Sequence, residues 1–299
     1  MARVLKKAGI GPNEMETVEG SRKRLRTVVK LMGRPTADLA EVMETRIEGP
    51  EGSIPVRLYR PKKSPKSGKA PLVLFFHGGG WILGGLDTSE ETLLMLCDIS
   101  GAVIVSVDYR LAPEHTFPSG LEDCYISTVW AANNASALGC DPRKLIVSGE
   151  SAGGNLATAT CLLAKQRKGP KIAYQILVYP NVDMARDMSE YSRSEFGPTP
   201  AELEWMIGLY LRNERESKNP LVSPILGHLR GLPPALIFTA ENDPLREQDE
   251  DYAKKLRKAG VRARTVNYPG AIHGFWNFPN HFDSGDDAVR KAARAIKNL

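Results

Sequence analysis

Residues 149–153, with the sequence Gly-Glu-Ser-Ala-Gly, are the part of this chain whose spacing most directly predicts chemistry. A serine on a sharp turn from a strand to a helix has its hydroxyl lifted clear of the backbone, and the flanking glycines let the two elements pass closely. An apolar run at 145–147 precedes the motif and an Ala/Leu-rich run at 155–165 follows it. This context predicts a nucleophile elbow rather than an ordinary glycine loop, with Ser151 as the nucleophile.

A second glycine-rich segment, 77–81 (HGGGW), directly follows the apolar run 72–76. Acyl transfer builds negative charge on a carbonyl oxygen, and backbone N–H groups reach that oxygen only where the chain can approach it closely, as glycines allow. The segment resembles the oxyanion loop that accompanies a nucleophile elbow. The alternative is a flexible glycine hinge after a strand.

A serine nucleophile needs a general base. In proteins with a nucleophile elbow, the order along the chain is serine, acid and histidine. The histidines after Ser151 are His228, His273 and His281. His273 lies in a turn just after the strand-like run 264–267, where a catalytic loop belongs. The other two lie in segments with glycine or proline that are typical of surface loops. The sequence therefore predicts His273 as the base.

Asp243 is the best candidate for the acid that orients the base. It follows the strand-like run 236–239, and Pro244 suits the first position of a helix, which places Asp243 at a strand-helix junction. An aspartate before proline is often only a helix N-cap. Asp183, which follows the strand-like run 174–179, is a rival acid. Local sequence alone leaves these alternatives open.

Taken together, these motifs resemble the hormone-sensitive-lipase-like group of α/β-hydrolase carboxylesterases over most of residues 70–280. Besides the glycine loop and the elbow, the resemblance includes 108–114 (DYRLAPE), 243–246 (DPLR) and 273–275 (HGF). It implies Asp243, rather than Asp183, as the catalytic acid. The oxyanion donors that it implies are the N–H groups of Gly79, Gly80 and Ala152.

The resemblance also implies that Glu150, Asp108 and Tyr109 support the site without reacting. The group's elbow commonly has aspartate where this chain has Glu150. The charge type is kept, but the longer carboxylate can move local hydrogen bonds. No H-E-x-x-H motif, Cys/His cluster or helix-opening G-x-G-x-x-G occurs in the sequence, so we expect no metal and no cofactor.

The elements that position these residues follow from hydrophobic patterning. Strand-like and helix-like runs alternate from residue 56 onward, which predicts an α/β-hydrolase fold with a mostly parallel central sheet of about eight strands flanked by helices. The expected strands are 44–48, 56–59, 72–76, 103–107, 145–147, 175–179, 236–239 and 264–267. Ligands of such sheets gather at the carboxyl ends of the strands, where Gly79, Ser151, Asp243 and His273 all fall.

The alternation stops after Asn181 for roughly 40 residues, a length uncommon for a plain loop. Within this stretch, 199–202 (TPAE) predicts an N-capped helix. One of its apolar faces carries Leu203, Met206, Ile207 and Tyr210, and a second carries Trp205 and Leu209. We expect one face to pack on N-terminal helices and the other to roof an acyl pocket; the alternative is a helix buried at the core edge. The candidate pocket residues are Trp81, Trp205 and Leu209.

These patterns predict one hydrolase core with a helical cap within the 299 residues. We expect N-terminal cap helices at 1–45, core segments at 46–180 and 223–299, and a cap insertion at 181–222. The net charge of +5 has a local source in a basic amphipathic helix that contains Arg22, Arg26 and Lys30. We interpret its basic residues as a solvated face, without nucleic-acid contact.

The remaining sequence features indicate in which compartment the protein works and which partners it has. The four cysteines form no C-x-x-C pair and are interpreted as small core residues. No apolar run approaches the roughly 20 residues that span a bilayer, so we expect no stable membrane insertion. The expectation is a cytoplasmic protein with a small-molecule ester as its partner, and the patterns leave a homodimer open.

The expected function is hydrolysis of short- to medium-chain carboxylic esters through an acyl-enzyme. Amide or lactone cleavage uses the same three residues and stays an alternative. A non-catalytic small-molecule receptor on the same fold is the alternative from another class. It is disfavoured because Ser151, Asp243 and His273 are all present.

Overall fold

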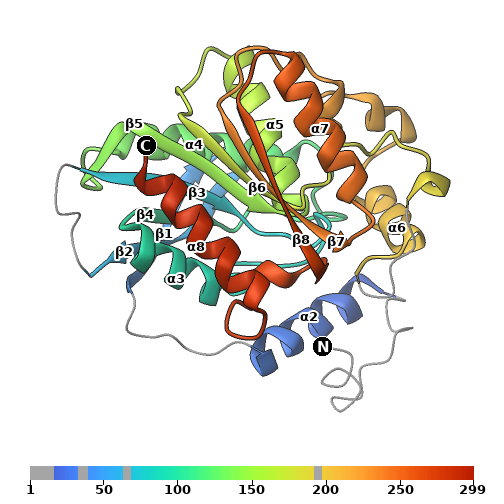
Figure 1. Cartoon of the computed structure of the whole chain (residues 1–299), viewed down its shortest axis with the longest axis horizontal. Coiled ribbons are helices and arrows are strands. Elements are labelled where there is room, and N and C mark those ends of the chain that lie inside the picture. The colour runs from blue at the N-terminus through green and yellow to red at the C-terminus, as the bar shows by residue number, and fades with distance from the viewer. Residues whose placement is uncertain (1–16, 33–39, 63–68, 192–196) are drawn as a thin grey trace.

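The computed structural model describes residues 17–32, 40–62, 69–191 and 197–299. Within these residues one sheet of eight strands has the order β1-β2-β4-β3-β5-β6-β7-β8 (Figure 1). The strands are β1 (Ala40–Gly49), β2 (Gly52–Pro61), β3 (Ala70–Phe76), β4 (Val103–Val107), β5 (Cys140–Glu150), β6 (Tyr174–Val178), β7 (Ala235–Asn242) and β8 (Ala263–Ile272).

The sheet is parallel from β4 to β8, and antiparallel only where β2 pairs with β1 and β4. The prediction of a mostly parallel sheet of about eight strands is confirmed. Every residue of β3 and β4 is buried, as their continuous apolar runs indicated. β1 begins at Ala40, which pairs with Pro61 of β2. Residues 40–45 therefore belong to a strand and not to the cap helices that we expected up to residue 45.

Helices cover both faces of the sheet (Figure 1). The helices α3 (Glu90–Ser100) and α8 (Asp283–Lys297) pack on one face. The other face carries α4 (Ser119–Asn134), α5 (Ala152–Gln166) and α7 (Arg246–Lys258). Short 3₁₀ helices lie at Met188–Glu190, Glu214–Lys218, Pro224–Leu226 and Phe275–Asn277.

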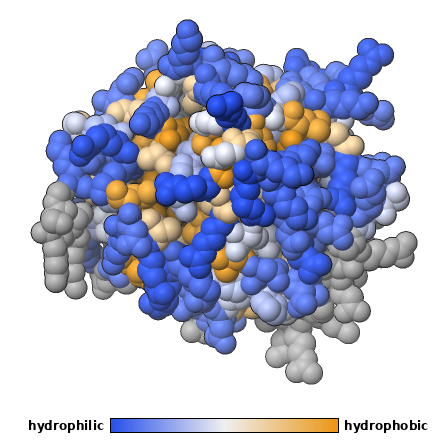
Figure 2. Space-filling model, turned by 45° about the horizontal axis from the view of Figure 1, so that its top comes forward, coloured by the Kyte–Doolittle hydropathy of each residue, from blue (hydrophilic) through white to orange (hydrophobic). Residues whose placement is uncertain are grey.

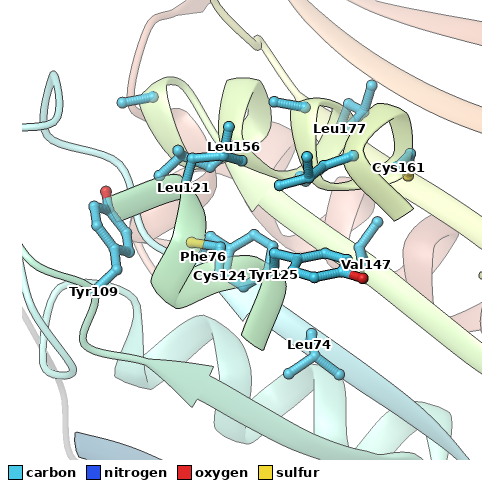
Figure 3. Close-up of a cluster of buried hydrophobic side chains, with 14 of the residues drawn as sticks. Leu74, Phe76, Tyr109, Leu121, Cys124, Tyr125, Val147, Leu156, Cys161 and Leu177 are labelled. Atoms are coloured by element: carbon cyan, nitrogen blue, oxygen red, sulfur yellow. The ribbon is translucent and has the colours of Figure 1, made fainter. Parts of the chain in front are cut away.

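A cluster of buried hydrophobic side chains joins β3 and β5 to the helices α4 and α5 (Figure 3). Leu74 and Phe76 of β3 and Val147 of β5 lie in one buried cluster with Leu156 of α5 and Leu121 of α4. Each such side chain stabilises the fold by about 1.5–3 kcal/mol when it is fully buried. The four cysteines are also buried and unpaired, which confirms their interpretation as core residues. The turn after β5 therefore lies at the end of a strand whose inner side chains are fully packed into the core.

A helix lies where the capping signal predicts it, at α6 (Pro200–Tyr210). The Thr199 hydroxyl accepts the Glu202 N–H, and the Glu202 carboxylate accepts the Thr199 N–H. This reciprocal pair satisfies two N–H groups that would otherwise lack partners at the helix start.

The helix α2 (Val18–Met32) is held to the core by a residue that we expected to be solvated. Arg22 donates to the Ile82 carbonyl at 2.9 Å, to the Ala112 carbonyl at 3.1 Å and to the Glu114 carboxylate at 2.7 Å. Arg26 and Lys30 are exposed as predicted. The prediction is wrong for Arg22, because helical periodicity does not show that polar acceptors lie opposite one basic position.

The visible surface in Figure 2 is mostly hydrophilic, with small apolar areas between charged side chains. Across the described ranges, no helix combines the length and the apolar character needed to cross a membrane. The same residues contain no cluster of histidine, cysteine and carboxylate side chains arranged to bind a metal ion.

Candidate active site

Ser151 occupies a strained turn between β5, which ends at Glu150, and α5, which begins at Ala152. Its φ of 53° and ψ of −118° are unusual for a residue with a Cβ. The glycines of the motif are needed for close approach. A Cβ on Gly153 would overlap the Phe76 carbonyl, and a Cβ on Gly149 would overlap the backbone of Gly153. This geometry is the one that the motif predicts for a nucleophile elbow.

The three predicted triad residues lie in hydrogen-bond contact. His273 Nε2 is 3.0 Å from Ser151 Oγ, and His273 Nδ1 is 2.8 Å from Asp243 Oδ2. Each residue directly follows a strand, β5 for the serine, β7 for the aspartate and β8 for the histidine. Because these strands are parallel, their carboxyl ends meet at one edge of the sheet and bring together residues 122 and 30 positions apart in sequence.

Two opposing effects act on the His273 imidazole. Burial disfavours the charged ring, whereas the charge and hydrogen bond of Asp243 favour it, and the pKa of His273 is raised above its ordinary value. The Asp243 contact also orients the ring, because Nδ1 carries the proton when it donates to the carboxylate and Nε2 is then free to accept from Ser151.

The turn after β7 differs from the sequence prediction. Helix α7 begins at Arg246, so Pro244 does not occupy its first position. The Leu245 N–H donates to Asp243 Oδ1 at 2.9 Å, and the Arg246 N–H donates to the Asp243 carbonyl at 3.2 Å. These bonds close a separate turn before the helix starts. They hold Asp243 while its second oxygen faces His273.

The rival acid lies in a different environment. Asp183 accepts the Ala185 N–H through Oδ1 at 3.2 Å, and its own N–H donates to Gln248. Its carboxylate therefore stabilises a local turn. His228 and His281 are both exposed, as predicted, and His281 donates from Nε2 to the Met32 carbonyl at 2.7 Å.

The glycine loop after β3 has a backbone that favours glycine. Gly79 and Gly80 have φ values of 116° and 60°, and Trp81 follows with a φ of 63°. The Gly79 carbonyl accepts the N–H groups of Ile82 and Leu83 at 3.2 and 2.8 Å, which closes the loop. The predicted oxyanion donors have no acceptor among the described residues; they are the N–H groups of Gly79, Gly80 and Ala152.

Glu150 connects the strand of the nucleophile to this loop. Its Oε1 accepts the Gly78 N–H at 2.6 Å and the Asn277 side-chain N–H at 3.2 Å. Asn277 in turn accepts from the Ser89 hydroxyl at 2.9 Å. Burial raises the pKa of Glu150, and the hydrogen bonds from Asn277 and Gly78 and the nearby His273 oppose that rise. The sequence predicted a supporting role for Glu150 but not these partners.

His77 and Tyr109 hold the glycine loop in place through hydrogen bonds and ring stacking. Burial lowers the pKa of His77 to about 4, so its ring is neutral near pH 7. The ring donates from Nδ1 to the Gly78 carbonyl at 2.8 Å and stacks on Tyr109 at 4.3 Å between centroids. The Tyr109 hydroxyl donates to the His77 carbonyl at 2.7 Å, consistent with the support predicted for Tyr109.

Helix α6 lies over the loop, but through residues that the sequence analysis did not place there. A Cβ on Gly80 would overlap the Met206 side chain, and the Tyr210 ring stacks on Trp81 at 4.8 Å. Trp205 and Leu209, the predicted pocket residues of this helix, are half-buried and pack against the same hydrophobic core. Their role in a substrate pocket stays a prediction, whereas Met206 and Tyr210 are additions from the structure.

Tyr179 is a neighbour of the candidate base that the sequence analysis missed. Its ring centroid lies 4.4 Å from that of His273, and its φ is 35°. The Tyr179 N–H donates to the Phe238 carbonyl at 2.7 Å, which fixes the backbone at the end of β6. Its position directly after a buried parallel strand was the available signal, because that edge of the sheet carries the site.

Comparisons with known proteins identify the family of the chain. A family model described as the alpha/beta hydrolase fold matches residues 73–277. The chain belongs to this family. It is 39% identical to an arylesterase of Saccharolobus solfataricus, over 82% of this chain and 80% of that protein. It is 40% identical to the carboxylic ester hydrolase LipN of Mycobacterium tuberculosis, over 88% of this chain and 71% of LipN.

A solved structure of a hyperthermophilic esterase from the archaeon Pyrobaculum calidifontis is similar over nearly the whole fold. The TM-score is 0.91 with 38% identity, and the match covers 99% of this chain and 96% of that chain. Together, these similarities confirm the resemblance to hormone-sensitive-lipase-like carboxylesterases of the α/β-hydrolase fold and the prediction that the chain is an enzyme.

Proposed function

We propose that this member of the α/β-hydrolase family is a serine carboxylesterase that acts through an acyl-enzyme. The observation that carries the proposal is the continuous hydrogen-bonded series from Ser151 through His273 to Asp243, with distances of 3.0 and 2.8 Å. The serine stands on a strained turn beside backbone N–H groups that have no acceptor among the described residues. This combination supplies a nucleophile, a base and an electrostatic site for an oxyanion.

In the first half of the reaction, His273 Nε2 takes the proton of Ser151 as Oγ forms a bond to the ester carbonyl carbon. The carbonyl electron pair moves onto oxygen, and the N–H groups of Gly79, Gly80 and Ala152 stabilise that oxyanion. When the electron pair returns, the bond to the alkoxy oxygen breaks and His273 gives its proton to the leaving alcohol. Asp243 stabilises the transient imidazolium throughout.

In the second half, a water molecule gives a proton to His273 and attacks the acyl carbon. The bond to Ser151 Oγ then breaks, the serine recovers the proton, and the carboxylic acid leaves. The raised pKa of His273 suits this cycle, because a base with a higher pKa accepts the serine proton more readily.

For the substrate, we propose carboxylic esters with short to medium acyl chains, held by a pocket that includes Trp81, Trp205 and Leu209. The helix α6 over the oxyanion loop supports a restricted pocket, since Met206 lies against Gly80 and Tyr210 against Trp81. Lactones and amides present the same carbonyl chemistry and belong in the substrate test. We also propose a cap formed by α2 and the insertion 181–222, and a cytoplasmic location.

The test is a series of initial rates on p-nitrophenyl esters of increasing acyl length. Wild type should hydrolyse the short members fastest, and Ser151→Ala should lower kcat by about 10⁴-fold or more. The matched control is Ser136→Ala, at an exposed position after α4. An active Ser151→Ala protein would refute the assigned nucleophile. An inactive wild type on every ester, lactone and amide would refute the enzyme and favour a receptor.

A further inference from the structure

A cavity of about 770 Å³ lies between α2 and the segments 84–88 and 108–115. None of the triad residues lines it, and neither do the glycines assigned to the oxyanion. Its lining consists of Arg22, Leu25, Arg26, Val29, Lys30, Gly84, Gly85, Leu86, Asp87, Thr88, Asp108, Leu111, Glu114 and His115. The volume falls within the range of small-molecule sites.

The cavity keeps its shape because α2 is anchored beside it. The Arg22 guanidinium bonds to the carbonyls of Ile82 and Ala112 and to the Glu114 carboxylate. The Ala112 N–H also donates to the Trp81 carbonyl at 2.9 Å, which joins the two core segments behind the helix. A cavity that is already formed requires little ordering when a ligand enters.

The charged groups of the cavity differ in whether they have partners. Asp87 pairs with Arg57 at 2.8 Å, Glu114 pairs with Arg22 at 2.7 Å, and Arg26 pairs with Glu19 at 2.9 Å, outside the cavity lining. The charges of Asp87, Glu114, Arg22 and Arg26 are therefore matched, whereas Lys30 lines the cavity at an exposed position of α2.

Asp108 is different, because its carboxylate has no hydrogen bond and no ion pair within the described ranges. It is half-buried, and its Oδ1 would lie 3.4 Å from a Cβ on Gly85, another lining residue. Burial raises the pKa of Asp108 and the charge of Asp87 adds to that rise, while the charges of Arg57 and Arg46 oppose it without forming an ion pair with Asp108. A cation placed beside this carboxylate would compensate both effects.

We propose that this cavity binds a small hydrophobic organic cation, with its ammonium group at Asp108 and its apolar body against Leu25, Val29 and Leu111. An apolar wall with one partly desolvated, unpaired carboxylate favours a ligand that is apolar at one end and positively charged at the other. None of the triad residues lines this cavity, so the binding proposed here does not depend on the function proposed above. The supporting role that the resemblance implies for Asp108 stays a prediction.

The experiment is calorimetric titration at pH 7.5 and constant ionic strength, with benzylammonium as the probe and benzyl alcohol as its neutral counterpart of similar size. Wild type should bind benzylammonium at least about tenfold more tightly than benzyl alcohol, a difference of about 1.4 kcal/mol. Asp108→Asn should remove this preference. The matched control Asp98→Asn, at an exposed position of α3, should keep it.

A second variant locates the binding and does not depend on how well Asp108→Asn folds. Val29→Trp places a larger side chain in the cavity and should abolish benzylammonium binding, while circular dichroism confirms that the fold is intact. Equal affinity for the two probes in wild type, a cation preference that survives in Asp108→Asn, or binding that survives in Val29→Trp would each overturn the proposal. The absence of binding to wild type at about 20 mM probe would also overturn the proposal, because it excludes a dissociation constant in the low millimolar range.

Discussion

Two regions beside the triad each bury a carboxyl side chain, but only one of them supplies hydrogen-bond donors to it. At the end of β5, Glu150 accepts N–H groups from Gly78 and Asn277. In the first turns of α7, Asp249 is fully buried, and neither of its oxygens has a hydrogen-bond partner among the described residues. Burial raises the pKa of both groups, and for Asp249 the nearby Asp243 raises it further.

The difference shows that burial alone does not identify a carboxylate that has a role in the active site. Desolvation disfavours the charged form at both positions, but only Glu150 has N–H donors that compensate it. Glu150 can therefore position the oxyanion loop through the N–H groups that it accepts. At Asp249 no donor offsets the burial and the charge of Asp243, so both favour the neutral acid, and holding a proton there at neutral pH costs stability.

The largest effect should follow from breaking the contact between Glu150 and the loop. In Gly78→Ala the new Cβ would overlap the Glu150 carboxylate, which can move away only by losing its bond to the Gly78 N–H. We expect kcat/KM on a short ester to fall by about 100-fold, because small displacements of catalytic groups have effects of that size. Gly208→Ala is the matched control, since nothing lies within 4 Å of a Cβ at that position of α6. Equal activities of the two variants would refute the role of Glu150 in positioning the loop.

Asp249→Asn should raise the free energy of unfolding by about 2 kcal/mol at pH 7.5, because the wild type must hold a proton there that the unfolded chain has released. The folded-state pKa is raised, so the penalty in wild type begins near the unfolded pKa of about 4 and grows as pH rises. The advantage of the variant should therefore be smaller at pH 5.5 than at pH 8.

Denaturant unfolding at these two pH values measures the difference, with Asp98→Asn on the exposed side of α3 as the control. A stability difference that is the same at both pH values would mean that Asp249 is ionised in the folded protein. The esterase activity of Asp249→Asn should stay within about twofold of wild type, since surface or remote changes that leave the triad contacts intact have small kinetic effects.

Glu150→Gln keeps the shape of the side chain but removes its charge. The charge of Glu150 contributes to the raised pKa of His273, so the acid limb of the pH profile of kcat/KM should move to lower pH in the variant. We expect kcat to fall by about tenfold, because a hydrogen bond to a charged acceptor is replaced by a weaker neutral one. Glu150→Asp restores the charge and should return the acid limb toward that of wild type. An unshifted acid limb in Glu150→Gln would show that the two groups are not coupled.

Asn277→Ala should give the smallest effect. It removes one of the two N–H partners of Glu150 and the acceptor of the Ser89 hydroxyl, while the stronger bond from Gly78 remains. A loss in kcat of about threefold is expected, in line with about 0.5–1.5 kcal/mol for one hydrogen bond. Asn298→Ala near the chain end is the control. A loss as large as that of Gly78→Ala would mean that Asn277, and not the Gly78 bond, holds the carboxylate.

The sequence by itself determined the strands, the elbow and the order of the triad residues. These features are local: continuous apolar runs predict buried strands, and Gly149 and Gly153 leave no room for a Cβ where β5 meets α5. Once the strands are parallel, their carboxyl ends bring Ser151, Asp243 and His273 to one edge. The resemblance to a known family then separated Asp243 from Asp183.

Only the tertiary structure decided which partner each side chain meets. Periodicity placed Met206 and Tyr210 on one face of α6, but not over Gly80 and Trp81. It placed Arg22 among basic residues, although its acceptors lie 60 to 92 positions away. A helical or strand pattern reports which residues share a face. The donor or acceptor opposite that face comes from distant chain segments, so the contacts of Arg22, Glu150 and Asp249 could be known only from the folded structure.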